Sequence, residues 1–555
     1  HLLDYLLKQR ELLDKLSIDP FNNVSVASAP INTLVTLGCG DGRALHYMLS
    51  HFQPFNLLIV VPDWESYASS FWFLDWNEIW SNYSASEFQS ISIARYEGLL
   101  EARNILLRSS LLGLDHAYTY VPFSDKHEDL IQLRKDLSGP ASHNAIHYLG
   151  FTLDEYNMVY NTITTIQAQP KLFNTPKIPS KGNCIVCGSG PSLDDCLDDI
   201  KQLVDTHIII SGGSNYSTLR AHGIVPDFLV LVERANNTYD DYLAVEQELG
   251  SSSTRLVMSS TCPVKLIDLY PDTCIFFRPA LTPLALFSQH ISEVLSFEGP
   301  EAINGAFSFA ETLGFENIAL FGTDLGTYDI NKPRSTKAAG PSPRSFPLKR
   351  PGNRIEEVYT SQSLLDTAEV MTFCAKNHDQ TSVYNCSNGI YIEQTKKSSP
   401  SEYKELFEKL TPSDKAKSLY AIDQWWESLD MFSSNMMQAI WDSRNPRAAT
   451  FKLSHQLKDL FLSDKPWIPV VVKELDQLLG LNCNVKDQIP RRIMRSTVYK
   501  ATLAFTQQYY INKSLNSDLQ TQFEKDARGA LADTVTYLEK EIYLLCDLAE
   551  SHFDF

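Results

Sequence analysis

A short stretch of glycine, serine and acidic residues is the part of this sequence best suited to chemistry. It reads Asn-Cys-Ile-Val-Cys-Gly-Ser-Gly-Pro-Ser-Leu-Asp-Asp over residues 183–195. Gly188 and Gly190 permit a close backbone approach or a positive φ, and Ser192 with Asp195 predicts a capping box at a helix start. Because N–H groups at such a start attract anions, we interpret the stretch as a turn that binds a nucleotide phosphate. Purely structural turns share this pattern, so that alternative stays open.

Three further runs end in small or polar residues. Residues 207–211, 228–232 and 318–321 are apolar and β-branched, which is typical of buried strands, and a helical pattern at 307–313 precedes the third. The polar groups that follow them are Asn215, Glu233 and Asp324. Since the carboxyl ends of parallel strands meet at one edge of a sheet, we expect these groups to line one crevice. The pattern predicts an α/β fold with a central, Rossmann-like parallel sheet.

Five motifs in a fixed order indicate a family. They are Gly-Ser-Gly-Pro-Ser-Leu at 188–193, His-Gly-Ile-Val-Pro-Asp at 222–227, Leu-Phe-Gly-Thr-Asp-Leu at 320–325, Val-Tyr-Thr-Ser at 358–361 and Val-Tyr-Asn-Cys-Ser-Asn-Gly at 383–389. Together they resemble the motility accessory factor (Maf) family. The resemblance implies a bacterial, cytoplasmic glycosyltransferase that moves a nonulosonic acid, pseudaminic or legionaminic, from its CMP derivative to Ser or Thr of flagellin. Which of the two acids is used stays open.

The same core also resembles bacterial CMP-sialic-acid sialyltransferases, whose Gly-Asn-Gly-Pro-Ser turn and Gly-Ile-Asp strand end hold the CMP. Here Ser189 stands in place of that Asn, and Gly322-Thr323-Asp324 stands at the second site. Those enzymes use no bound metal and take a His as general base, but Tyr359 and Thr360 lie near the matching position. The resemblance therefore implies no metal cofactor, and the identity of a base stays open.

The strand-end positions and the resemblance together predict the site residues. A CMP-linked donor is already activated, so the protein mainly orients the reactants and stabilises the departing phosphate. We expect Asp324 to assist the acceptor hydroxyl, with Tyr359 and Thr360 as further catalytic residues. Asn304 and Gly305 are expected between a strand and a helix, facing the sugar. The residues expected to hold the donor are Gly188, Ser189, Gly190, Pro191, Ser192, Asn215, Glu233, Asn304, Gly305, Gly322, Thr323, Tyr328 and Ser361.

A segment at 331–354 reverses the charge of the chain, which carries a net charge of -19. It has no acidic residue, and its basic residues are Lys332, Arg334, Lys337, Arg344, Lys349, Arg350 and Arg354. Its proline, glycine and serine content predicts a loop. We expect a mobile lid over the anionic sugar nucleotide. A solvated loop without ligand contact is the alternative.

Polar, proline-containing stretches near 167–183 and 396–400 predict the domain boundaries. We expect a Rossmann-like amino-terminal domain at 1–168, a sialyltransferase-like catalytic domain at 169–398 and a helical domain at 399–555. In the last, amphipathic runs at 423–441 and 527–553 predict long helices. An aromatic and methionine stripe there is expected to be helix core, and it consists of Trp425, Trp426, Phe432, Met436, Met437 and Trp441.

The amino-terminal region carries a rival glycine-rich turn. An amphipathic helix is predicted at 2–16, and a strand at 33–37 leads into Gly38-Cys-Gly40-Asp-Gly42-Arg43 and a helix at 44–52. A second strand at 57–61 is followed by Asp63, where methyltransferases bind a ribose. Because such glycine patterns are permissive, we favour a nucleotide fold kept for packing.

Composition narrows the remaining choices. A chain of 555 residues with 43% hydrophobic residues is expected to form several packed domains, and its acidic balance argues against a nucleic-acid binder. No apolar run approaches the length of a membrane span. The ten cysteines are scattered, and Cys184 and Cys187 should point to opposite faces of a strand, which argues against a metal or redox pair. The oligomeric state stays open.

Two other functions stay open. The glycine-serine core also resembles archaeal 6-hydroxymethylpterin pyrophosphokinases, which would use ATP and magnesium and need no protein acceptor. The other alternative is a non-catalytic, flagellin-binding export factor that retains a nucleotide fold. The long helical carboxyl-terminal region favours a protein acceptor over a pterin.

Overall fold

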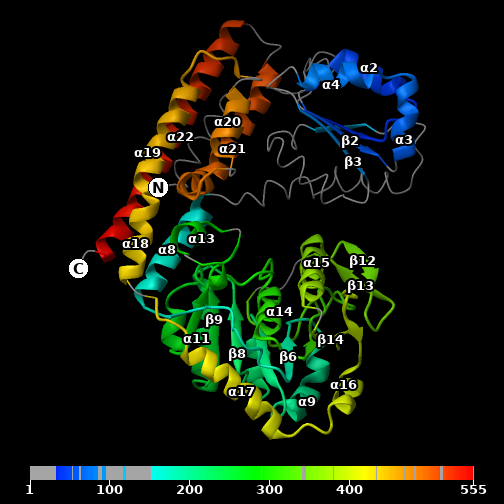
Figure 1. Cartoon of the computed structure of the whole chain (residues 1–555), viewed down its shortest axis with the longest axis vertical. Coiled ribbons are helices and arrows are strands. Elements are labelled where there is room, and N and C mark those ends of the chain that lie inside the picture. Colours follow the sequence, from blue (N-terminus) through cyan, green and yellow to red (C-terminus); the bar gives the residue numbers. More distant parts are fainter. Residues whose placement is uncertain are drawn as a thin grey trace. The chain divides into compact units, whose positions relative to one another are not determined.

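The computed structural model describes residues 33–52, 54, 56–61, 64–84, 90–95 and 117–120, and residues 152–553 except 280, 289, 341–344, 379, 433, 468–470, 481–482 and 513–516. The helix predicted at 2–16 lies outside these residues. The chain forms two compact units, one of His1–Glu155 with Pro446–Leu544 and one of Tyr156–Asn445 with Leu545–Phe555 (Figure 1). These units group the helices after residue 399 differently from the three predicted domains, whose boundaries stay predictions.

The second unit is built on a nine-stranded sheet in which every pair of neighbours is parallel. Its order is β15-β14-β11-β6-β7-β8-β9-β10-β5. The strands are β5 Lys171–Leu172, β6 Asn183–Cys187, β7 Ile208–Gly212, β8 Phe228–Leu231, β9 Arg255–Ser259, β10 Thr273–Phe276, β11 Asn317–Phe321, β14 Ser382–Asn385 and β15 Lys396–Lys397. The central strands are apolar along their length because both faces of a parallel sheet are buried. The predicted α/β fold with a central parallel sheet is confirmed.

Helices cover both faces of this sheet (Figure 1). One face packs against α14 Ala302–Leu313, α15 Gln362–Asn377 and α17 Pro412–Glu427, and the other against α9 Leu193–Leu203 and α16 Pro400–Leu406. Cys184 lies in the first core and Cys187 in the second, so the prediction that they point to opposite faces is confirmed. None of the ten cysteines, all of which are among the described residues, is in a disulfide.

The remaining elements of this unit connect the strands or flank the sheet. They are α8 Thr152–Gln167, which begins in the first unit, α10 Asn215–Ala221, α11 Asn237–Leu249, α12 Leu266–Leu269, α13 Thr282–Phe287, α18 Ser434–Arg444, and the antiparallel pair β12 Leu348–Pro351 and β13 Glu357–Thr360. The strand β12 corrects one expectation, because part of the basic segment at 331–354 is a strand held by backbone bonds to β13 and not a loop throughout.

The connections of the sheet reverse between β6 and β11. From β6 the chain adds β7, β8, β9 and β10 on one side, and β11 then pairs with β6 on the other side. Loops that leave two such strands diverge, and they open a crevice at the carboxyl ends of the strands. This position in the fold is where a ligand site is expected.

The first unit contains a four-stranded parallel sheet of order β3-β2-β1-β4. Its elements are β1 Thr33–Leu37, α2 Arg43–Phe52, β2 Asn56–Val61, α3 Trp64–Ser69, α4 Trp76–Ser84, β3 Ser90–Arg95, β4 Ala117–Tyr120, α19 Pro446–Phe461, α20 Val472–Leu479, α21 Val485–Asn512 and most of α22 Ser517–Phe553. The glycine-rich turn does join a strand to a helix, and Gly38, Gly40 and Gly42 have positive φ values. Asp63 lies outside the described residues.

The carboxyl-terminal region is helical in its described part, as predicted. The run expected as one helix at 423–441 is an exception, because α17 ends at Glu427 and α18 begins at Ser434. The backbone between them pairs with the edge of the sheet, where Leu172 N donates to Asp430 O and Phe432 N donates to Pro170 O. Trp426 in α17 and Trp441 in α18 are buried, so their assignment to helix core is confirmed. Phe432 is also buried, but it lies between the two helices. Trp425 is half-buried, and the side chains of Met436 and Met437 lie outside the described residues.

A search of the described helices for a segment long and apolar enough to cross a membrane finds none.

Candidate functional site

A cavity of about 480 Å³ lies at the carboxyl ends of β6, β7, β8 and β11. Its walls come from the loops that follow these strands, from the first turn of α14 and from the segment after Asp324. Seven of the predicted site residues line it, namely Gly188, Ser189, Gly190, Glu233, Gly322, Thr323 and Asp324. Of the three strand-end groups expected to share one crevice, Glu233 and Asp324 line this cavity and Asn215 does not.

Glycines allow the loops after β6 and β11 to touch. A Cβ atom on Gly188 would lie 2.6 Å from the carbonyl oxygen of Gly322, and a Cβ on Gly190 would overlap the carboxylate of Asp324. Gly322 has a φ of +61°, a conformation that other residues rarely adopt. The predicted close approach at Gly188 and Gly190 is confirmed, and neither of these two glycines has a positive φ.

Asp324 joins the two loops through Ser192. The backbone N–H of Ser192 donates to Oδ2 of Asp324 at 2.8 Å, and its hydroxyl donates to Oδ1 at 2.7 Å. The capping box predicted for Ser192 and Asp195 is wrong, because the Ser192 hydroxyl is a donor to Asp324 and makes no capping bond to α9. The chain's own carboxylate thus occupies the position at the start of α9 where a phosphate was predicted. We call these two bonds the Ser192–Asp324 contact.

Two other backbone donors of the turn are also used within the protein. Gly188 N donates to the carbonyl of Phe321 at 2.8 Å, and Gly190 N donates to the carbonyl of Gly322 at 2.7 Å. Asp324 itself is fully buried, and this burial raises the pKa of its carboxyl to about 6 against the opposing bonds from Ser192. These contacts favour a positioning role for Asp324 over the predicted catalytic one, which stays a prediction.

Asn215 and Asn304 are buried in hydrogen bonds that hold the loops. Asn215 Nδ2 donates to the carbonyls of Cys187 and Gly212 at 2.6 and 2.9 Å, so it ties the ends of β6 and β7 together. Asn304 accepts from Glu301 N at 3.1 Å and donates to the carbonyl of Thr367 at 3.0 Å. Neither amide is among the groups that line the cavity.

The prediction that Asn304 and Gly305 precede a helix is wrong. The helix α14 begins at Ala302, because Glu301 caps it and forms a capping box with Asn304. Gly305 therefore lies inside the helix, where it packs against Val230 and Val232 of the sheet.

The predicted residues around β13 support the loop that follows Asp324 and do not line the cavity. The Thr360 hydroxyl donates to the carbonyl of Leu325 at 2.7 Å, and Tyr359 exchanges two backbone bonds of 2.8 Å with Thr327. The Tyr328 hydroxyl donates to Asp195 at 3.0 Å. Ser361 is the N-cap residue of α15, although its side chain makes no capping bond. Pro191 likewise lies outside the lining.

One wall of the cavity is acidic. Among the described residues that line the cavity there is one arginine, Arg334. The carboxylates are Glu233, Asp241 and Glu301, in addition to buried Asp324. Burial raises the pKa of the Glu301 carboxyl most, and the nearby charge of Glu233 raises it further. The positive charge of Arg334 acts in the opposite direction and lowers this pKa. Burial, and then Asp240, raise the pKa of Asp241. A carboxyl group with a raised pKa in a cleft is a candidate for proton transfer.

Arg334 comes from the basic segment, and hydrogen bonds to neighbouring loops hold it at the cavity. Its Nη2 donates to the Ser214 hydroxyl and to the carbonyl of Ala339, both at 2.6 Å, and its Nη1 donates to the carbonyl of Gly340 at 3.2 Å. Other basic residues of the segment pair with carboxylates, as Lys332 does with Asp194 and Lys349 with Glu357. Arg344 lies outside the described residues. The segment lines one wall, and its opening as a lid stays a prediction.

Sequence reasoning did not select Glu301, Asp241 or Ser214. The rule that polar residues follow strands could not find Glu301 or Asp241, because the first precedes a helix and the second lies inside α11. The same rule could have selected Ser214, because this residue directly follows Gly212-Gly213 at the end of a strand.

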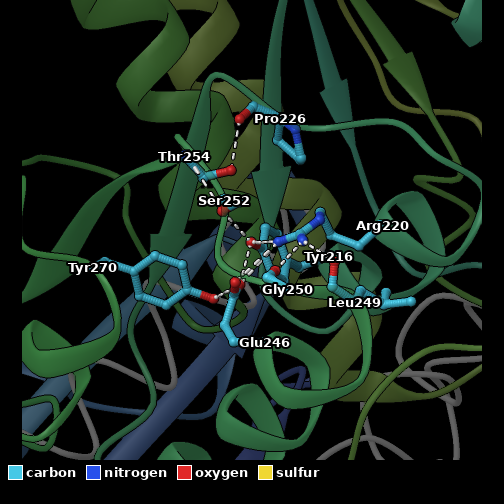
Figure 2. Close-up of polar contacts among 9 residues, drawn as sticks. All are labelled: Tyr216, Arg220, Pro226, Glu246, Leu249, Gly250, Ser252, Thr254 and Tyr270. Carbon is cyan, nitrogen blue, oxygen red and sulfur yellow. Dashed lines mark hydrogen bonds and ion pairs between the residues drawn. The ribbon is translucent and has the colours of Figure 1, made fainter.

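A buried ion pair holds the helices whose amino-terminal ends reach the cavity (Figure 2). Arg220 on α10 pairs with Glu246 on α11 at 3.0 Å, with both side chains almost fully buried. The hydroxyls of Tyr216 and Tyr270 donate to the same Glu246 oxygen, and Arg220 Nη2 donates to the carbonyl of Gly250. Because donors from α10 converge on this carboxylate of α11, the network fixes α10 against α11.

Among the described residues, no three His, Cys, Asp or Glu side chains converge as metal ligands would.

Two comparisons with known proteins bear on the fold of this chain. Residues 156–329 match the family model described as 6-hydroxymethylpterin diphosphokinase MptE-like, which covers the cavity loops as far as Asp329. A solved structure, the Maf glycosyltransferase from Magnetospirillum magneticum AMB-1, superposes with a TM-score of 0.75 and 24% sequence identity over 94% of this chain and 80% of that one. No curated protein sequence matches the chain. The predicted resemblance is therefore confirmed, and this chain has the fold of a Maf glycosyltransferase.

Proposed function

We propose that this protein is a glycosyltransferase that moves a nonulosonic acid, of the pseudaminic or legionaminic type, from its CMP derivative to Ser or Thr of flagellin. The observation that carries the proposal is the cavity between β6 and β11, at the point where the connections of the sheet reverse. Its volume of about 480 Å³ lies in the range of small-ligand sites. The similarity of fold to a Maf glycosyltransferase supports the same reaction class.

The lining residues divide into groups that suit the parts of such a donor. Gly188, Ser189, Thr323 and Glu233 all line the cavity. We assign the loops around the first three to the nucleotide and Glu233 to the ribose hydroxyls. Among the described residues that line the cavity, Arg334 is the one with a positively charged side chain. We therefore assign it to the phosphate that departs with CMP. Asp324 positions the loops through the Ser192–Asp324 contact.

The transfer needs one proton acceptor. The acceptor oxygen forms a bond with the anomeric carbon of the sugar, the bond from that carbon to the CMP phosphate breaks, and the hydroxyl proton moves to a base. We assign the base to Glu301, which lines the cavity and can accept a proton when ionised. The raised pKa of its carboxyl brings it closer to the working pH, which favours general base catalysis.

A magnesium-dependent diphosphokinase acting on a hydroxymethylpterin is the second candidate. Two observations favour it, namely the match of residues 156–329 to the MptE-like model and the acidic wall of the cavity. Carboxylates suit Mg²⁺ bound with a nucleoside triphosphate. The third candidate, an export factor that binds flagellin without chemistry, predicts binding but no product.

One assay separates the three. Purified protein is mixed with unglycosylated flagellin and either CMP-pseudaminic or CMP-legionaminic acid. The reaction is run once with EDTA and once with magnesium, and the mass of the flagellin is measured by intact-mass spectrometry. The proposal predicts a mass increase of one sugar residue per site in EDTA, and its loss in Glu301→Gln with flagellin binding retained. A parallel reaction with ATP and hydroxymethylpterin that yields AMP only with magnesium would replace the proposal with the second candidate.

A further inference from the structure

A second cavity, of about 270 Å³, lies beside the first in the same unit. One side comes from α8 and the other from the loop that follows β8. The residues that line it are Tyr156, Asn157, Tyr160, Asn161, Arg234, Ala235 and Asn236. The residue Ala235 also lines the first cavity, so a single loop forms the wall between the two.

The position of this shared wall is set by α8. Asn161 is buried, and its Nδ2 donates to the carbonyl of Arg234 at 3.1 Å and to that of Thr261 at 2.9 Å. The first bond holds the loop after β8, and the second holds the end of β9. Asn161 thus ties α8 to the loop that both cavities share and to the end of β9.

The lining of the second cavity suits a polypeptide. The rings of Tyr156 and Tyr160 stack with an interplanar angle of 12°, and Tyr160 is 43% exposed. Two amide side chains, Asn157 and Asn236, stand beside them. Tyrosine and asparagine together are typical of protein-binding surfaces, because a rigid ring covers apolar groups and an amide pairs with both N–H and C=O of a peptide backbone.

We infer that the second cavity is the subsite that holds the acceptor polypeptide next to its reacting hydroxyl. The inference rests on the proposed function, in which a donor occupies the first cavity and an acceptor must reach it from an adjoining position. Ala235 lines both cavities, so in this arrangement the donor and the acceptor lie on opposite sides of the loop that contains it. The acceptor polypeptide passes over this loop, and its reacting hydroxyl enters the first cavity next to the sugar and Glu301.

The test is direct binding of fluorescently labelled, unglycosylated flagellin to the whole protein, measured by anisotropy. Tyr160→Ala should raise the flagellin Kd by about tenfold, the usual effect of losing an aromatic interface residue. Asn157→Ala, at a second exposed position of the lining, should weaken binding in the same direction. Tyr420→Ala is the matched control, since that tyrosine is 67% exposed on α17 of the same unit and should leave the Kd unchanged. Calorimetry with CMP should give the same affinity for all four proteins.

Wild-type flagellin affinity in both Tyr160→Ala and Asn157→Ala would overturn the inference, and so would a wild-type protein that does not bind flagellin. The inference would also be overturned if the two variants lost the ability of the wild type to bind a free oligosaccharide but kept its affinity for flagellin. The second cavity would then be assigned to a glycan. The proposed function is judged separately, because CMP affinity and the mass increase on flagellin report on the first cavity. A protein that transfers sugar with unchanged flagellin affinity in the variants keeps the function and loses only the subsite.

Discussion

Replacement of Asp324 by Asn should distinguish a positioning residue from a catalytic one. The carboxylate accepts two bonds from Ser192, at 2.8 and 2.7 Å, while fully buried. Hydrogen bonds to a charged group contribute about 1.5–3 kcal/mol each. The amide of Asn keeps one acceptor oxygen, so the substitution should remove about one such bond, or about 2 kcal/mol. Ser192→Ala removes the hydroxyl bond alone and should cost about 1–2 kcal/mol.

The assay is calorimetric CMP binding combined with turnover on flagellin for both single variants and the double variant. If the Ser192–Asp324 contact positions the loops and these costs fall on the binding-competent state, each single variant weakens CMP binding by about five- to thirtyfold, and the double variant is little worse than Asp324→Asn. The two residues then act as one unit. A loss of turnover in Asp324→Asn with wild-type CMP affinity, and no effect of Ser192→Ala, would refute this reasoning and restore the catalytic role.

Three further variants test single contacts. Glu311→Gln removes a buried carboxyl whose pKa is raised by burial from 4.5 to about 8. The folded state holds this proton where the unfolded state releases it, so wild-type stability falls as pH rises from 4.5 to about 8, by up to about 5 kcal/mol. Melting temperatures at several pH values should show the variant without this fall. Glu301→Gln should lower kcat about 10²-fold or more with CMP affinity unchanged, and an unaltered kcat in a mass-spectrometric rate assay would exclude it as base. Gly190→Ala places a methyl group against Asp324 and should abolish CMP binding in calorimetry, whereas the control Gly529→Ala, which meets no atom within 4 Å, should not.

The central sheet could be predicted because its signals are local. Apolar runs at β6, β7, β8 and β11 appear in the sequence as continuous stretches, and each ends in glycine or a polar residue. The close approach at Gly188 and Gly190 was also predictable, since only glycine leaves room for a second backbone.

The parts that failed depend on partners far apart in the sequence. Ser192 was expected to cap α9, but its partner Asp324 is 132 residues away. The run at 423–441 has a helical period, and its break at Asp430 comes from backbone pairing with Leu172 at the edge of the sheet. Local propensity cannot anticipate either contact.

The acidic wall was missed for a related reason. Glu301 caps a helix, although Ser, Thr, Asp and Asn are the usual capping residues, so no start signal stood in front of Asn304. Asp241 lies within α11, and it lines the same cavity as Glu301 and Arg334 only because the loops of several strands converge there. A site built from helix starts is harder to predict than one built from strand ends.

The proposal that the cavity between β6 and β11 holds a CMP-activated sugar is tested most directly by calorimetry with CMP, ATP and S-adenosylmethionine, each with and without magnesium. We expect CMP to bind equally well in EDTA and in magnesium, and to lose its affinity in Gly190→Ala but not in Gly529→Ala. Binding of ATP that requires magnesium, without binding of CMP, would contradict the proposal. Binding of S-adenosylmethionine that is unaffected by Gly190→Ala would place a ligand site away from this cavity.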